Sequence, residues 1–158
     1  MNQGIVAFSG YLGKIALIHF VFSTKNRESL ITAERRPGLY EYMGGTIRSP
    51  GGISLEINGM SDHVHLLSKL RPDESVSNAI RSLKANASGW MHKVFPELSG
   101  FKWQDGYGGF TVSQSQVEQV RKYIRLQEHH HQKRSFKDEF TELLKINGIE
   151  FNEEHLWK

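Results

Sequence analysis

Two histidines stand one residue apart in a stretch that alternates them with apolar residues. His63 and His65 flank Val64, and Leu66 follows. If this stretch is a β-strand, its side chains alternate between two faces, so both imidazoles point to one side while Val64 and Leu66 point into a core. Two imidazoles side by side on a rigid strand can chelate one metal ion, and such a pair still lacks a third ligand.

A later helix offers the missing ligand together with a nucleophile. The capping-box pattern Ser115-Gln116-Val117-Glu118 predicts a helix from there to about Gln132. Tyr123 and Gln127 are four residues apart on it and therefore lie one above the other on the same side. They adjoin an apolar stripe, so packing of this stripe on an open sheet face would bring them to the two histidines. The stripe consists of Val117, Val120 and Ile124.

Such a group of side chains suits the cleavage of a phosphodiester. A tyrosine with its usual pKa of about 10 is a weak nucleophile at neutral pH, and the charge on a phosphodiester repels attack. A divalent cation withdraws that charge and fixes the phosphate in line with the phenol. The product would be a 5′-phosphotyrosine and a free 3′-hydroxyl. Because the ester retains the bond energy, the strands can be rejoined without ATP.

The rest of the chain predicts the frame that holds these residues. The order is β-α-β-β-α-β followed by helices, which is typical of an α+β, ferredoxin-like fold with a four-stranded antiparallel sheet and additional C-terminal helices. Helices on one face leave the second face open for a site or another helix. The expected elements are a strand over 14–22, a helix after Thr32 through Ile47, strands over 53–58 and 63–70, a helix from Arg71 to before Pro96, a strand over 110–112, the tyrosine-bearing helix, and a helix from Ser135 to Gly148.

Composition narrows the class of protein. A chain of 158 residues with 38% hydrophobic and 23% charged residues predicts a single globular domain over 1–158. It contains no apolar run long enough to cross a membrane and no basic, then apolar, start of the kind that marks a secretory signal. The absence of cysteine fits a cytoplasmic protein and excludes thiolate metal sites. A net charge of +3 tolerates a polyanionic partner without identifying one.

These motifs resemble a known family. His63-Val64-His65 is similar to the His-hydrophobic-His (HUH) motif, and Tyr123-x-x-x-Gln127 to the tyrosine motif, of the single-tyrosine HUH transposases, which move bacterial insertion sequences as single strands. The resemblance runs over about 14–157 and leaves 1–13 as a poorly matched N-terminal extension. It also rests on the stretches 19–27, 103–108 and 127–130.

The resemblance implies an enzyme and its partners. It implies a Mg²⁺- or Mn²⁺-dependent single-stranded DNA endonuclease and strand transferase, in which His63, His65 and Gln127 bind the metal and Tyr123 is the nucleophile. It further implies a substrate of single-stranded DNA with hairpin ends. It also implies a homodimer with composite active sites, in which the tyrosine helix of one subunit can complete the site of the other.

Two other classes of function fit parts of the pattern. The same β-α-β-β-α-β order serves nucleic-acid-binding modules without catalysis, but those carry aromatic residues on the central strands where this chain has histidines. A metal-dependent phosphodiesterase would use bound water in place of Tyr123. Changing Tyr123 to Phe separates this phosphodiesterase from the tyrosine transposase, because hydrolysis would survive and transesterification would stop.

Further residues are candidates for contacts with DNA. Lys25, Arg27, Arg81 and Lys84 suit phosphates, and Trp103 or Tyr107 suit stacking on unpaired bases. Ordinary surface charge and an aromatic loop anchored in the core are the simpler interpretations of these residues.

The remaining histidines have their own interpretations. Consecutive helical residues point about 100° apart, so His129, His130 and His131 cannot all bind one ion; we expect a solvated or DNA-facing helix end. His19 could share the strand face of the pair if its strand lies beside theirs, but a core histidine with a satisfied hydrogen bond is the favoured interpretation. Asp62 is either a carboxylate that orients a ligand histidine or a turn residue.

Overall fold

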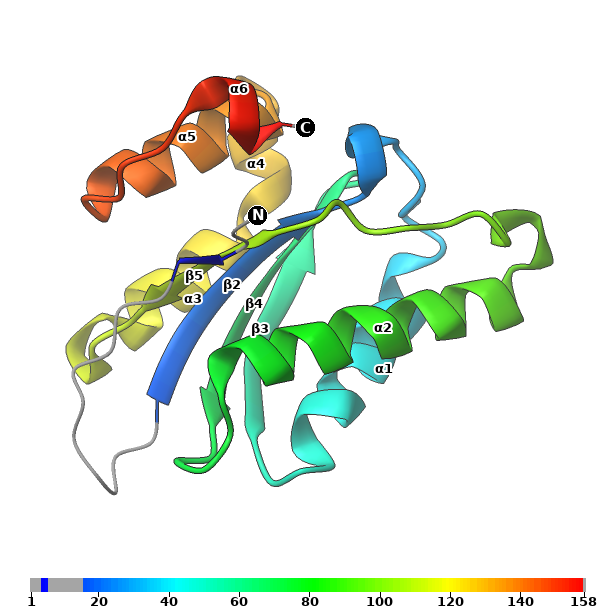
Figure 1. The fold of residues 1–158 in the computed structure, drawn as a ribbon, viewed down its shortest axis with the longest axis horizontal. Coiled ribbons are helices and arrows are strands. Elements are labelled where there is room, and N and C mark those ends of the chain that lie inside the picture. Colours follow the sequence, from blue (N-terminus) through cyan, green and yellow to red (C-terminus); the bar gives the residue numbers. More distant parts are fainter. Residues whose placement is uncertain (1–3, 6–15, 158) are drawn as a thin grey trace.

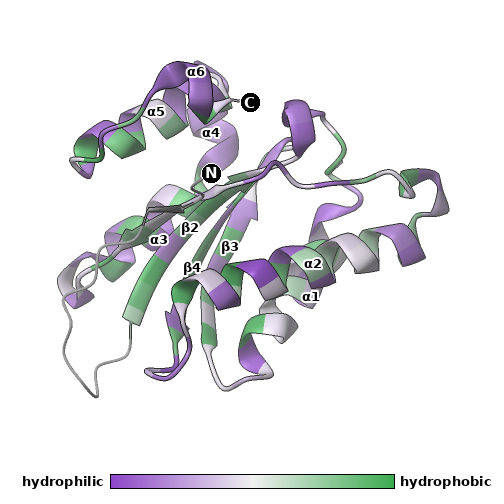
Figure 2. Cartoon of the chain, viewed as in Figure 1, coloured by the Kyte–Doolittle hydropathy of each residue, from purple (hydrophilic) through white to green (hydrophobic). Residues whose placement is uncertain are grey.

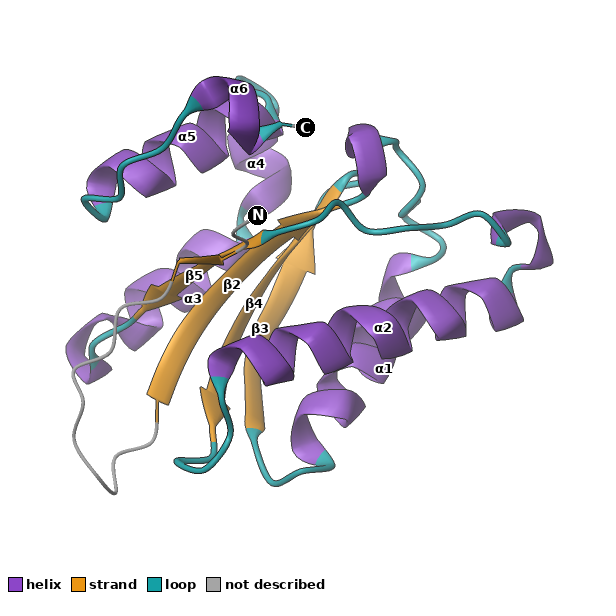
Figure 3. Ribbon diagram, in the orientation of Figure 1, coloured by secondary structure: helices purple, strands orange, loops and turns teal. Residues whose placement is uncertain are grey.

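The computed structural model describes residues 4–5 and 16–157, and its centre is a sheet in the order β1-β5-β2-β4-β3 (Figures 1 and 3). The four longer strands pair antiparallel, and the two-residue β1 pairs parallel with β5 at the edge. The predicted ferredoxin-like sheet is therefore confirmed, with β1 as an addition. The strands are β1 (Gly4–Ile5), β2 (Ala16–Ser23), β3 (Ile53–Gly59), β4 (His63–Leu70) and β5 (Tyr107–Thr111).

Helices cover both faces of this sheet. Figure 1 shows α1 and α2 lying together on one side, while α3 to α6 follow β5 and lie on the other. The predicted extension 1–13 lies outside the described residues apart from β1. The helices are α1 (Arg36–Arg48), α2 (Val76–Val94), α3 (Val117–Arg125), α4 (Gln127–His131), α5 (Phe136–Ile146) and α6 (Glu153–Leu156), with short 3₁₀ turns at Lys25–Arg27, Pro96–Leu98 and Gln114–Gln116.

The main core lies between the sheet and the α1–α2 pair. β2 is hydrophobic over most of its length (Figure 2) and buried from Leu17 to its end, as expected for a central strand. Val64 and Leu66 of β4 point into this core, as the alternation predicts. Because Val64 and Leu66 face α1 and α2, the histidines between them face the opposite side of the sheet.

Two smaller apolar clusters attach the later helices to that opposite face. Val117 and Ile124 of α3 pack against Leu17 and Leu67, as the predicted stripe requires. Helix α5 packs separately, and the C-terminal tail folds back onto it. This second cluster includes Val21, Phe110, Phe136, Phe140 and Trp157. The open face of the sheet is thus covered by two helices with the histidines between them.

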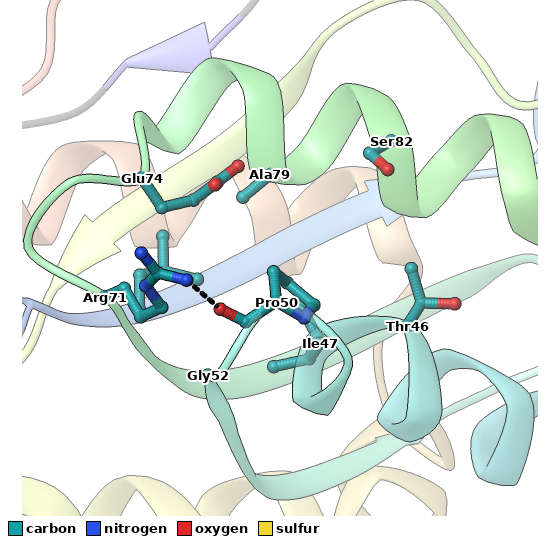
Figure 4. Close-up of a pocket in the computed structure, with 9 residues that line it drawn as sticks. Thr46, Ile47, Pro50, Gly52, Arg71, Glu74, Ala79 and Ser82 are labelled. Atoms are coloured by element: carbon teal, nitrogen blue, oxygen red, sulfur yellow. Dashed lines mark hydrogen bonds between the residues drawn. The ribbon is translucent and has the colours of Figure 1, made fainter.

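The predicted start of α2 is wrong by several residues. The helix begins at Val76, where the Ser75 hydroxyl accepts a hydrogen bond from the Asn78 N–H at 3.1 Å. Arg71 does not join it, because its guanidinium pairs with Asp73 and donates to the Pro50 carbonyl at 2.7 Å. Arg71 and Pro50 border a pocket of about 40 Å³ between α1 and α2 (Figure 4). This pocket lies on the α1–α2 face, away from the histidines.

The single helix predicted from Ser115 to Gln132 is divided. Ser115 lies in a 3₁₀ turn and does not cap a helix, so the predicted capping box there is wrong. Helix α3 ends at Arg125, and Leu126 leaves the helical conformation at φ −94° and ψ 24°. The Asn58 amide of β3 donates to the carbonyls of Ile124 at 3.0 Å and Arg125 at 3.1 Å. These bonds satisfy carbonyls at the end of α3 and anchor that end to the sheet.

Candidate active site

The two strand histidines lie side by side in the interior. His63 and His65 are both fully buried, and their ring centroids are 5.2 Å apart. Residues 60–62 connect β3 to β4, and β4 pairs with β2 along its whole length, which fixes the register of both histidines. The Nε2 atoms of both rings approach one oxygen atom of Glu139, at 3.4 Å from His63 and 2.9 Å from His65.

Glu139 of α5 is the centre of this cluster, and the sequence analysis missed it. Its carboxylate is fully buried and contacts five side chains from three other elements. A signal was present, because Glu139 falls within the apolar spacing of α5 formed by Phe136, Phe140, Leu143 and Leu144. Besides the two strand histidines, its partners are His131 Nε2 at 3.0 Å, Gln127 Nε2 at 3.2 Å and the Tyr123 hydroxyl, which donates to Oε2.

Tyr123 and Gln127 reach the histidines from the end of α3 and the start of α4. The Gln127 side-chain oxygen lies 3.0 Å from His63 Nε2, and its amide donates to Glu139. The Tyr123 ring lies edge-on to the ring of His65, with centroids 5.8 Å apart. The four residues singled out from the two sequence motifs therefore converge within one chain.

The histidine run at 129–131 corrects one expectation. His131 is not solvated: its side chain is 7% exposed and its Nε2 bonds to Glu139. Its Nδ1 lies 2.9 Å from the Arg134 carbonyl, which fixes the ring from the other side. His130 stacks on Tyr123 at 4.6 Å. Helical geometry does prevent all three from meeting at one point, but it permits His131 to enter the cluster while His129 stays outside.

The outward nitrogens of the strand histidines also have partners. Asp62 Oδ1 lies 2.7 Å from His63 Nδ1, as an orienting carboxylate would. His19 Nε2 lies 2.8 Å from His65 Nδ1, and His19 is buried in the sheet as expected. Each imidazole of the pair is thus held at both ring nitrogens.

Burial and hydrogen bonds within the cluster determine which of its side chains carry a charge. Burial opposes a charge on His63, yet its hydrogen bonds to Asp62 and Glu139 raise the pKa to about 9. Burial lowers the pKa of His65 to about 4 and that of His19 to about 3. Burial would raise the pKa of Glu139, but the surrounding histidines hold it well below its usual range. At neutral pH a carboxylate and an imidazolium therefore face each other inside the protein.

The phenol of Tyr123 is held in its protonated form. Burial and the neighbouring Glu139 carboxylate together raise the pKa of Tyr123 above its ordinary value. A phenolate beside a carboxylate would place two negative charges in contact, which is unfavourable away from water. The resting chain therefore holds a phenol hydrogen-bonded to Glu139.

The donor set fits a divalent cation. One nitrogen from each of His63 and His65 and one oxygen from Glu139 lie within 4.8 Å of one another. The side-chain oxygen of Gln127 adjoins the same group. Imidazole nitrogens with carboxylate and amide oxygens suit ions such as Mn²⁺, and a buried carboxylate supplies the negative charge that such an ion requires.

The residues proposed for DNA contacts divide between α2 and the turn after β2. Arg81 is exposed on α2, on the opposite side of the sheet, and the Lys84 ammonium on the same helix donates to the carbonyls of Gln104 at 2.8 Å and Gly106 at 2.9 Å. Lys25 lies in the 3₁₀ turn after β2, where Arg27 lies 5.3 Å from the Trp157 ring.

The aromatic loop is anchored in the core at Trp103. This side chain is 7% exposed and packs edge-on against Phe22 and Phe101, so the expected stacking on unpaired bases does not hold for it. Its indole N–H donates to the Lys84 carbonyl at 3.1 Å. Tyr107 is half-buried against Phe20. The simpler interpretation, a core-anchored loop, therefore applies here.

Comparison with known proteins decides the family. The family described as "Transposase IS200 like" matches residues 15–127, which is most of the chain. This protein belongs to the IS200-like transposase family. The segment that matches the IS200-like family contains both strand histidines, Tyr123 and Gln127. Membership implies an activity that cleaves and rejoins DNA.

Individual relatives of this IS200-like transposase agree with that assignment. It is 27% identical over 114 residues to the ISDra2 transposase TnpA of Deinococcus radiodurans, covering 69% of this chain and 81% of the relative. It is 28% identical over 115 residues to the transposase for insertion sequence element IS200 of Salmonella typhimurium, covering 69% and 74%.

Solved structures show the same fold. A crystal structure described as a transposase candidate from Deinococcus radiodurans R1 matches with a TM-score of 0.61 and 26% identity, over 77% of this chain and 96% of that one. A REP-associated tyrosine transposase bound to a REP hairpin matches with a TM-score of 0.59 and 16% identity, over 79% and 73%. No helix among residues 4–5 and 16–157 of this IS200-like transposase has the length and apolar character that crossing a bilayer requires.

Proposed function

We propose that this transposase cleaves and rejoins single-stranded DNA through a 5′-phosphotyrosine on Tyr123, at a Mg²⁺ or Mn²⁺ site that includes His63 and His65. The observation that carries the proposal is the convergence of a phenol, two imidazoles, an amide and a carboxylate on one small volume. Family membership supplies the reaction class, and this cluster supplies groups that can perform it.

Each side chain has a defined part in the proposed reaction. The Tyr123 oxygen attacks phosphorus, the bond from phosphorus to the 3′-oxygen breaks, and the 5′-phosphate becomes esterified to the phenol. The phenol proton, which already points at Glu139 Oε2, ends on the departing 3′-hydroxyl. Rejoining reverses these steps with the 3′-hydroxyl of another strand, so no outside energy source is needed.

The metal would be held by His63, His65 and oxygen ligands from Gln127 and Glu139. When bound, a divalent cation reduces the negative charge on the phosphate that the phenol attacks. Gln127 is the oxygen ligand that the family resemblance implies, and Glu139 is added here because its carboxylate lies at the same point. Both α4 and α5 then contribute to one site.

Access to this site requires helix α5 to move. His63, His65, Gln127 and Glu139 are each 0% exposed, so a DNA phosphate cannot reach them in the arrangement described. The α5 helix is held mainly by the aromatic cluster around Phe136 and Phe140. We expect a single-stranded substrate to enter where α5 lifts from the sheet, and Glu139 to bind the ion when α5 closes again.

The proposed substrate is single-stranded DNA with hairpin ends. A structural relative is described as bound to a REP hairpin, and it shares the fold of this chain. The candidate contacts Lys25 and Arg27 follow β2 at the end of the sheet where His63 also lies, because the Thr24 N–H donates to the Asp62 carbonyl at 2.9 Å. A strand that reaches the histidines would pass this turn.

The test is a covalent trapping experiment. Protein is incubated with Mn²⁺ and hairpin-bearing single strands carrying either a 3′-end or a 5′-end label, and the products are separated under denaturing conditions. A 5′-phosphotyrosine places only the 3′-end label on the protein. We expect the labelled band to disappear with chelator and with Tyr123→Phe, and to persist in Tyr42→Phe, a change on the surface of α1.

Two outcomes would contradict the proposal. Cleavage that continues in Tyr123→Phe would indicate that water attacks, as in a metal-dependent phosphodiesterase. Binding of the hairpin strand without cleavage in Mn²⁺ would indicate a nucleic-acid-binding module.

The subunit arrangement has a separate test. Every group named above comes from one chain, whereas the family resemblance implies a homodimer that shares its tyrosine helices. Mixing His65→Ala with Tyr123→Phe protein distinguishes the two arrangements. We expect no covalent band from the mixture if each chain assembles its own site, and a restored band if dimers exchange α3.

A further inference from the structure

The buried imidazole of His19 is not used by the proposed reaction, yet it contacts a residue that is. His19 lies on β2, and its neighbours on the same face of that strand, Leu17 and Val21, are apolar. An apolar residue would satisfy such a position without the cost of burying a polar ring. The His19 ring is hydrogen-bonded through its Nε2 to His65 Nδ1 at 2.8 Å.

The geometry of the pair constrains how His65 can face the cluster. The two rings stack with centroids 5.1 Å apart and an interplanar angle of 29°. Phe110 and Tyr123 pack against His19 from two other sides, at 6.0 Å and 6.4 Å between centroids. His19 is therefore fixed, and rotating the His65 ring would break its hydrogen bond. With Nδ1 occupied by His19, the nitrogen that remains for the site is Nε2.

We propose that His19 is a positioning residue of the metal site, which holds the His65 ring so that Nε2 is the ligating atom. The inference rests on the proposed function, because it assumes that His65 binds a divalent cation. Asp62 holds His63 in the equivalent way at 2.7 Å, so both imidazoles of the pair present Nε2 inward. Hydrogen-bonded partners of this kind orient metal-bound histidines and raise their affinity for the ion.

The two partners differ in a way that the sequence alone did not indicate. Asp62 is a carboxylate whose side chain is 26% exposed, whereas His19 is an imidazole in the sheet interior. His63 therefore has a charged partner next to solvent and His65 a polar ring in a dry environment. If the His19 hydrogen bond is lost, water is a poor replacement for it in the sheet interior. The orientation of His65 therefore depends on His19 itself.

Mn²⁺ binding to the full-length chain without DNA tests this proposal. His19→Phe keeps an aromatic ring and removes the hydrogen bond, and His19→Gln keeps a polar group of similar reach. Calorimetric titration should show affinity for Mn²⁺ reduced by about 10- to 100-fold in His19→Phe and within about threefold of wild type in His19→Gln. Thermal unfolding in chelator measures any purely structural effect of the same changes.

Several results would overturn the proposal. One is a lower melting temperature of His19→Phe with unchanged Mn²⁺ affinity, which would make His19 a structural residue only. Another comes from histidine ¹⁵N spectra of the wild type with Zn²⁺ as a diamagnetic probe: ligation of His65 through Nδ1 excludes the proposed role even if His19→Phe fails to fold. Failure of the wild type to bind either ion overturns both this inference and the metal site. Metal binding without a covalent DNA band overturns the proposed function alone.

Discussion

Replacing Glu139 by Gln removes the negative charge from the centre of the cluster while almost preserving its shape. The carboxylate is fully buried and contacts His63, His65 and His131. Removing one partner from a buried ion pair generally costs about 3–5 kcal/mol, because the other charge is left without compensation. For a chain of this size each kcal/mol lowers the melting temperature by about 2–4 °C, so we expect Glu139→Gln to melt roughly 6–20 °C below wild type.

The assay is thermal unfolding followed by circular dichroism in chelator, so that metal binding does not contribute. Glu142→Gln is the matched control, because it removes a carboxylate from the same helix. The Glu142 side chain is 51% exposed and pairs with Arg134. An exposed ion pair contributes about 1 kcal/mol or less, so the control should change little. Equal melting temperatures for the two variants would refute the idea that Glu139 compensates buried positive charge.

Two further predictions concern stability. The pKa of His63 is raised to about 9, so this residue contributes about 3 kcal/mol to the free energy of unfolding below pH 6.5, and this contribution is lost as the pH rises through 9. The lowered pKa values of His65 and His19 have the opposite effect, because they reduce stability as the pH falls below 6.5. Urea unfolding in chelator should show a maximum near pH 6.5, and a steady rise from pH 6.5 to 9 would contradict this. Gly59→Ala places a Cβ 2.1 Å from the His63 carbonyl oxygen and should lower the free energy of unfolding by about 3 kcal/mol. Gly89→Ala lies in open space inside α2 and should raise the free energy of unfolding by about 0.5–1 kcal/mol. Equal effects of the two changes in the same assay would refute the steric reasoning.

The sequence predicted those parts of the cluster that depend on local periodicity. The two-residue period of β4 places His63 and His65 on one face, and the four-residue spacing on the later helix places Tyr123 beside Gln127. The order of strands and helices predicted the sheet and its open face. These inferences need only short stretches of chain, and the structure brings the resulting side chains together.

The features that the sequence did not predict depend on contacts between distant segments. The break at Leu126 follows from hydrogen bonds to Asn58, a residue on another strand, which no helical pattern around Leu126 reveals. Glu139 was overlooked because an acidic residue on a short helix is normally exposed. The inward position of His131 follows from the same return of α5 over the sheet, since Glu139 is its partner.

The match to the family ends at Gln127, twelve positions before the buried carboxylate. A protein trimmed to the matched segment would keep the phenol, the amide and the strand imidazoles and lose the anion that they surround. The end of the family match therefore falls inside this side-chain cluster. Mutations confined to the matched segment, residues 15–127, would therefore not include Glu139, which has more partners in the cluster than any other residue.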